Sequence, residues 1–295
     1  MIYIISMIER ISMLGFSEPI SSWTHLVSAL FFLIGGVYLC HKGRGNKLRF
    51  FSLFVYAFCG VFLFSMSGVY HLLEKGSDAN YVLQILDHAG IYLMISGSFT
   101  PFHVILLRGL NRWIPLLLIW VMAITGVVLT SIFFSSMPEW LLLTFFISMG
   151  WMSLFMVWHI RKIDPSTNRL IFIGGILYTF GAIVDFARWP NPLVGVLEAH
   201  EIFHVFISAA AIVHFFAIYR VADFPVSERL VLIIKKYPDK ITAKFKTERP
   251  IFSASSVNEV KLKASGWVEA KFFKDHSPRE IKLCYFEEEF FVLKD

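Results

Sequence analysis

The 295-residue sequence has few charged residues and few cysteines. Only 17% of its residues are charged, against about a quarter in soluble domains, which excludes an ordinary cytosolic enzyme. Three scattered cysteines, Cys40, Cys59 and Cys284, exclude a disulfide-stapled secreted scaffold and have neither metal-binding nor redox spacing. Hydrophobic residues make up 56% of the chain, which excludes intrinsic disorder and indicates a membrane protein.

Seven apolar runs are each about long enough to cross a bilayer as a helix, since a hydrocarbon core about 30 Å thick needs roughly 20 residues. We predict an all-α seven-transmembrane bundle over residues 23–220, preceded by an interfacial segment over residues 1–22. The predicted spans are Trp23–Leu39, Leu48–Leu73, Leu83–Leu107, Trp113–Phe134, Trp140–Trp158, Leu170–Phe186 and Val196–Tyr219.

The net charge of +5 comes from bases in short loops and in the tail, as in topology signals, so we expect no nucleic-acid partner. The loops after the first, third and fifth runs carry nine lysines and arginines, whereas the opposite side has Arg10, Lys75 and Arg188. The positive-inside rule therefore predicts an N-terminus outside and a cytoplasmic tail.

The tail beyond Arg220 has no run long enough to span a membrane. We predict an amphipathic helix around Ser227–Lys236 and then alternating segments, which together make residues 226–295 a small β-rich soluble appendage. Its one histidine, His276, belongs to no catalytic pattern. We interpret the tail as a regulatory or interaction module whose protein partner the sequence does not identify.

Several polar residues are predicted to meet in one leaflet. His200 and His204 are four apart, as are Ser67 and His71, so each pair projects from one face of its helix. Antiparallel threading places the end of the second span and the starts of the third and seventh spans together, which brings in Asp87. Three imidazoles with one open position for water describe a catalytic zinc site, in which the pKa of the water falls to about 7. Asp87 is then the general base or orients the water.

Other histidines offer alternatives. His25, at the start of the first span, shares this leaflet and is the rival third ligand. His88 lies about 100° around its helix from Asp87 and serves packing or supports the site. Three isolated histidines are interpreted as packing or interfacial residues: His103, His159 and His214.

The sequence from His200 to His204 also matches the H-E-x-x-H pattern of metalloproteases, in which the glutamate is the general base. Such enzymes commonly take a third ligand downstream, where only the rest of the span and the tail follow, so an intramembrane protease is a minor alternative. Helical geometry rotates Glu201 away from the histidine face toward the wet end of the helix. Asp185 and Arg188 are interpreted as a self-neutralising pair.

Residues 17–220 resemble the hemolysin III family, the bacterial branch of the progestin and adiponectin receptor superfamily. The matching blocks are Glu18-Pro19 with Thr24-His25, Ser67 to His71, Leu86 to Phe102, and His200 to His204. The resemblance implies a seven-helix fold with zinc on His71, His200 and His204, and Ser67 and Asp87 near the metal water. The chain has Ser21-Ser22 where related sequences often have asparagine.

This resemblance suggests hydrolysis of lipid amides such as ceramide. We therefore expect an integral membrane zinc-dependent hydrolase, with Asp87 managing the proton, Ser67 holding water or the oxyanion, and a membrane lipid as substrate. The alternatives are a membrane-perturbing or pore-forming protein and a receptor-like sensor, both with structural zinc. We expect a bacterial inner membrane location. The receptor branch implies an N-terminus inside, but we give this chain's own loop charges precedence.

Overall fold

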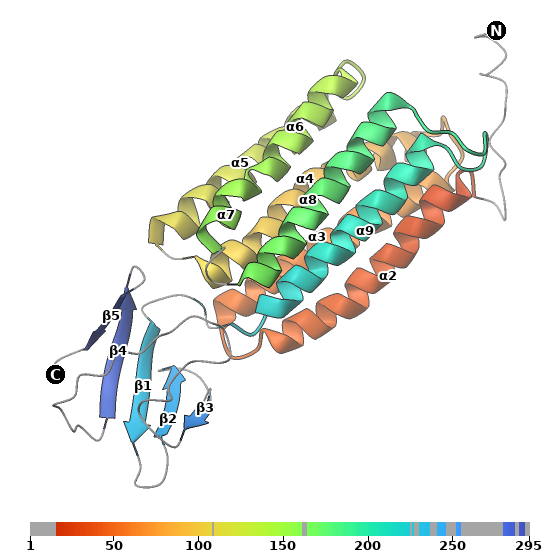
Figure 1. Ribbon diagram of the computed structural model, residues 1–295. Helices are drawn as coiled ribbons and strands as arrows, with labels where there is room; N and C mark the ends of the chain where they lie inside the picture. The colour runs from red at the N-terminus through yellow and green to blue at the C-terminus, as the bar shows by residue number, and fades with distance from the viewer. Residues whose placement is uncertain are drawn as a thin grey trace.

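The computed structural model describes residues 16–107, 109–160, 164–224 and 226, and the backbone of five strands in the tail (Figure 1). Within these residues, seven helical segments are long and apolar enough to cross a membrane, as predicted. The helices are α2 (Pro19–Lys42), α3 (Lys47–Leu72), α4 (Asp78–Leu106), α5 (Gly109–Phe133), α6 (Glu139–Trp151), α7 (Ser153–Ile160), α8 (Pro165–Ala187) and α9 (Ala199–Val221).

Polar residues in the short loops define where several helices begin. The side chains of Asn46, Ser77 and Asp164 accept hydrogen bonds from backbone N–H groups two or three residues further on, at the starts of α3, α4 and α8. These bonds satisfy N–H groups that have no partner within the helix. The loops therefore end sharply, and each helix begins at a fixed residue.

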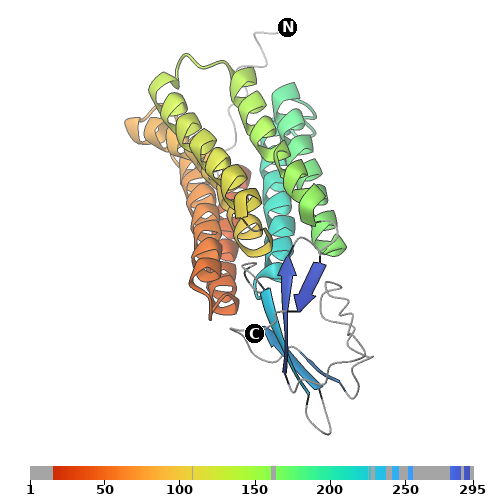
Figure 2. The same ribbon diagram turned by 90° about the vertical axis from the view of Figure 1, so that its left-hand side faces the viewer.

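The helices lie side by side as an antiparallel bundle with α4 at its centre (Figures 1 and 2). Of the apolar window of α4, 78% is buried, and this helix contacts α3, α5, α6, α7 and α9. The first and last spans, α2 and α9, also contact each other. This contact brings the two ends of the membrane domain together.

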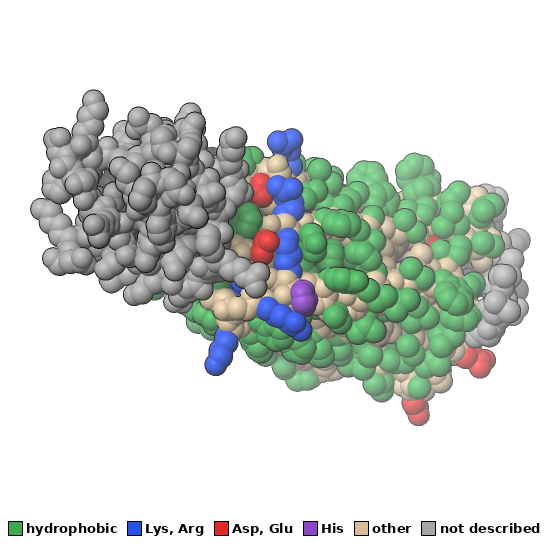
Figure 3. Space-filling view, turned by 90° about the horizontal axis from the view of Figure 1, so that it is seen from below, with side chains coloured by type: hydrophobic (Ala, Val, Ile, Leu, Met, Phe, Trp, Pro, Cys, Tyr) green, Lys and Arg blue, Asp and Glu red, His purple; other side chains and the backbone are tan. Residues whose placement is uncertain are grey.

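The outer surface of the bundle is apolar. Large hydrophobic side chains such as Val37 and Leu117 are more than 60% exposed, which suits contact with lipid chains and not with water. Figure 3 shows hydrophobic side chains covering the helices, with lysines and arginines gathered in a band at one end. The chain is therefore an integral membrane protein.

Two parts of the fold differ from the sequence prediction. The fifth span is broken at Met152, where α6 ends and α7 begins, instead of forming one helix. The amphipathic helix predicted around Ser227–Lys236 is wrong over Leu230–Lys236, which form a strand. The β-branched residues Val231, Ile233 and Ile234 in this apolar run favour a strand over a helix.

The strands described in the tail pair antiparallel in the order β3-β2-β1-β4-β5. The β-rich appendage as a whole stays a prediction, because the segments that connect most of these strands, with His276, lie outside the described residues, as does the predicted N-terminal segment up to residue 15. The strands are β1 (Leu230–Lys236), β2 (Ile241–Phe245), β3 (Phe252–Ala254), β4 (Glu280–Phe286) and β5 (Glu289–Val292).

Candidate metal centre

Three histidines from two helices converge at one end of the bundle. His71 lies in the last turn of α3, and His200 and His204 lie one turn apart at the start of α9. One ring nitrogen from each histidine lies within 4.8 Å of those of the other two, and the Nε2 atoms of His200 and His204 are 3.1 Å apart. Neutral imidazoles are common metal ligands, so this cluster can hold a metal ion.

Two carboxylates support the cluster from behind. Nδ1 of His71 donates a hydrogen bond to Oε2 of Glu18, and Nδ1 of His200 donates to Oδ1 of Asp185 at 2.9 Å. A histidine whose Nδ1 carries the proton presents the lone pair of Nε2, and such carboxylate–histidine pairs typically accompany metal ligands. Nε2 of His71 is buried without a hydrogen-bond partner among the described residues, which fits this arrangement.

The carboxylates of Glu18 and Asp185 were not predicted to support metal ligands. The predicted pair of Asp185 and Arg188 is present at 3.6 Å, but His200 lies closer to the same carboxylate, and Arg188 also pairs with Glu139. The alternation of antiparallel spans between the two leaflets could have placed both acids near the cluster, since Glu18 precedes the first span and Asp185 lies near the end of the sixth. Both positions fall in the leaflet of His71.

Glu201 is buried instead of lying at the wet end of its helix. Its carboxylate accepts hydrogen bonds from the backbone N–H of Glu198, in a capping box, and from Oγ of Ser21 at 3.3 Å. Ser22 donates to the backbone carbonyl of Gly68 at 2.6 Å. Ser21 and Ser22 therefore tie α2 to α9 and to α3.

Ser67 and Asp87 line the same cavity as His200 and His204. Oγ of Ser67, one helical turn before His71, is buried and has no hydrogen-bond partner among the described residues. Asp87 is half-buried in α4, which packs against α3. The cavity thus has polar groups beside the three histidines, although the roles predicted for Ser67 and Asp87 stay predictions.

The other histidines that the structure describes are not members of the cluster. His25 is not among the three that converge, although its ring contacts that of His204 with the centroids 4.0 Å apart. Apart from the exposed His41, the other described histidines each donate one hydrogen bond from the ring to a backbone carbonyl, consistent with packing roles: His88 to Gln84, His103 to Phe99, His159 to Phe155 and His214 to Ile171.

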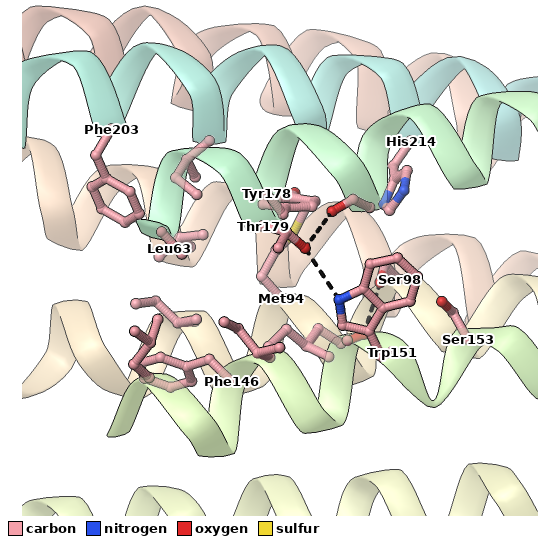
Figure 4. A pocket seen from close by; sticks show the side chains of 18 of the residues that line it. Leu63, Met94, Ser98, Phe146, Trp151, Ser153, Tyr178, Thr179, Phe203 and His214 are labelled. Atoms are coloured by element: carbon pink, nitrogen blue, oxygen red, sulfur yellow. Dashed lines mark hydrogen bonds between the residues drawn. The ribbon is translucent and has the colours of Figure 1, made fainter. Parts of the chain in front are cut away.

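The cavity continues away from the metal centre into the apolar interior. Its volume is about 250 Å³, and its walls come from several helices. Figure 4 shows the side chains of Leu63, Met94 and Phe203 around it. Farther along, Nε1 of Trp151 donates to Oγ1 of Thr179 at 3.2 Å. A polar end and a long apolar wall suit an amphipathic ligand such as a lipid.

Comparison with known proteins identifies relatives of this chain. The family described as "Haemolysin-III related" matches residues 15–215. Hemolysin-3 of Bacillus cereus is 30% identical over 196 residues, covering 65% of this chain and 83% of the relative. A hemolysin-3 homolog of Bacillus subtilis is 29% identical over 195 residues, covering 65% and 85%. The human monocyte to macrophage differentiation factor is 24% identical over 215 residues, covering 70% and 84%. The chain belongs to the haemolysin-III related family, as its motifs suggested.

Proposed function

We propose that this protein is a zinc-dependent hydrolase that cleaves amide bonds of membrane lipids. The observation that carries the proposal is the cluster of His71, His200 and His204 at the polar end of an apolar cavity. The substrate class also follows from the location of the cavity inside a membrane-spanning bundle. A lipid can enter such a cavity with its carbonyl group toward the histidines and its chain along the apolar wall.

Zinc fits the donor set. Three neutral imidazoles with a fourth position left open are typical of catalytic zinc sites, whereas structural sites are closed by a fourth protein ligand. The group that converges among the described residues has three members. The carboxylates of Glu18 and Asp185 orient His71 and His200 and balance the charge of a divalent cation, so the site needs no further protein ligand.

The chemistry is divided between the metal and the side chains around it. Bound zinc supplies Lewis-acid chemistry, which polarises a carbonyl oxygen and lowers the pKa of a water molecule. Asp87 accepts the proton of the attacking water and returns it to the amine that leaves. The hydroxyl of Ser67 donates a hydrogen bond to the water or to the oxyanion that develops on the carbonyl.

The protease alternative loses support because Glu201 is otherwise engaged. In the H-E-x-x-H mechanism the glutamate must face the attacking water. Here its carboxylate caps α9 and accepts from Ser21, so it is held within the contact of α2 and α9. Asp87, which lines the cavity, is the better base.

Charge supports placing the metal centre in the outer leaflet. Lys75 pairs with Glu18, and Arg188 pairs with Glu139, so two bases at the metal end are neutralised. At the opposite end, three exposed bases make no ion pair with the described residues: Arg44, Lys47 and Arg169. The positive-inside rule counts lysines and arginines in short loops, and by this count the end opposite to the metal centre belongs on the cytoplasmic side.

The test combines metal analysis with an activity assay on purified protein. We expect one zinc per chain and release of fatty acid from ceramide in detergent or nanodiscs. The matched control is His214→Ala, which removes a histidine that lies along the cavity but outside the cluster and should keep zinc. Stoichiometric zinc with no hydrolysis of any lipid amide tested would overturn the hydrolase and favour a structural metal.

A further inference from the structure

A fourth imidazole, that of His25, lies beside the metal centre. It is 3% exposed, stacks obliquely on the ring of His204 at 4.0 Å, and meets Phe64 edge to face at 5.0 Å. A ring that lies against a ligand's ring cannot easily direct a nitrogen at the same point. His25 therefore occupies the position of a neighbour of the cluster and not that of a ligand.

The ring of His25 is buried with both nitrogens unpaired by the hydrogen-bond geometry of the described residues. Neither nitrogen makes a bond of ordinary geometry with any residue that the structure describes, although burying an unpaired polar group is costly. The ring lines the cavity, as does Ser67, whose hydroxyl is also buried and unpaired. Two polar side chains, from α2 and α3, thus face one cavity without hydrogen-bond partners in the part of the chain that the structure describes.

The position of His25 is set by hydrogen bonds on either side of it. Ser21 donates to Glu201 at 3.3 Å, and Ser28 donates to Ser208 at 3.0 Å, and in both pairs the residues are 180 positions apart. Because α2 and α9 run in the same direction, this constant offset fixes their register over two turns. The ring of His25 lies between the two bonds and is held against the cavity.

We propose that His25 is a substrate-binding residue that donates a hydrogen bond from its ring to the oxygen of the scissile acyl group, together with Ser67. This inference rests on the proposed function. A neutral imidazole has one N–H donor and one acceptor, so it can bind a carbonyl oxygen without bearing charge. A fixed donor in a water-poor site stabilises charge on that oxygen more than water does.

The test measures binding and not turnover. Decanoate, a fatty acid with the acyl group of a lipid amide product, is titrated into cobalt-loaded protein, and the visible spectrum of the metal reports binding. We expect His25→Phe to bind decanoate at least about tenfold more weakly with unchanged metal content, since one hydrogen bond to a charged group is lost. His25→Leu, which has no hydrogen-bond donor in its side chain, should show the same loss.

The matched control is His103→Phe, which replaces a histidine that is equally buried with an unpaired Nε2 but lies outside the cavity. Its decanoate affinity should equal that of the wild type. Wild-type affinity in a folded His25 variant overturns the inference, and loss of metal from that variant also overturns it by making His25 a ligand. Wild-type protein that takes up no metal overturns the proposed function instead.

Discussion

Glu18 and His71 are joined twice, although 53 positions separate them. The carboxylate of Glu18 accepts from Nδ1 of His71, and the backbone N–H of Glu18 donates to the carbonyl of His71 at 3.0 Å. The other carboxylate oxygen pairs with Lys75 at 2.6 Å. The start of the first span is thereby fixed to the end of the second. The orientation of one ring in the cluster depends on a residue that precedes the membrane domain.

Removal of any one of the three clustered histidines should abolish stoichiometric metal binding. His71→Ala, His200→Ala and His204→Ala each leave two imidazoles, too few for a stable zinc site in a protein. Metal content of purified protein is the measurement, with His159→Ala as the control because that ring lies at the opposite end of the bundle. Retention of metal by all three variants would show that the cluster is not the site.

Removal of the supporting carboxylates should weaken metal binding without abolishing it. Glu18→Ala and Asp185→Ala should each reduce metal affinity about 10- to 100-fold, because the imidazoles of His71 and His200 lose the group that fixes their orientation. Competition with a chromogenic chelator measures the affinity. Glu139→Ala is the control, since it removes the Arg188 partner but no hydrogen bond to a clustered histidine. Equal affinities in all variants would assign the two acids a purely structural role.

Asp87→Asn should keep the metal and lose turnover. An amide in place of the carboxylate preserves size but cannot accept a proton, and general-base catalysis typically contributes about 10²- to 10⁴-fold. Metal content and ceramide hydrolysis are measured on the same preparation. Full activity in the variant would transfer the role of the base elsewhere, with Glu201 the next residue to test.

Acid should destabilise the N-terminal end of α8 by protonating Asp164, its N-cap residue. Partial burial acts to raise the pKa of Asp164, but hydrogen bonds from Thr167 and the pairing with Arg220 outweigh it and hold the pKa below its ordinary value. A lowered pKa in the folded state means that the stabilisation is complete above about pH 4 and is lost as the pH falls through the folded pKa. Melting temperatures in detergent should therefore decline less steeply with acid in Asp164→Asn than in the wild type.

The same residue offers a test at neutral pH. Asp164 caps α8 by accepting from the backbone of Ser166 and Thr167. Asp164→Ala should cost about 1 kcal/mol, the usual contribution of an N-cap. Asp164→Asn retains the cap, so its free energy of unfolding should fall less than that of Asp164→Ala. Identical melting temperatures for the two variants would show that the cap contributes nothing measurable.

A reporter that functions only in the cytoplasm should be active when fused after Asp295. The reason is the excess of lysines and arginines in the short loops at the end of the bundle opposite to the metal centre. A reporter that functions only outside should be silent at the same position. The reverse pattern would place the metal centre on the cytoplasmic side and make an internal lipid pool the substrate.

The sequence was enough to predict seven spans and the convergence of three histidines, because span length and antiparallel threading need no tertiary detail. It did not reveal the break at Met152, since the fifth run is apolar on both sides of that residue. It also missed the contact of Asp185 with His200 and the burial of Glu201. Local spacing favours the neighbour in sequence, whereas the observed partners of both acids include residues that only packing brings close.

The constant offset between α2 and α9 has a consequence for how the protein is made. The first span cannot make its contacts with α9 until the last span has entered the membrane, because Ser21 and Ser28 bind residues of α9. The metal centre likewise needs Glu18 and His204, which are synthesised at opposite ends of the membrane domain. A nascent chain that stops before Ala199 lacks two of the three clustered histidines, so the cluster is complete only after the last span has been made.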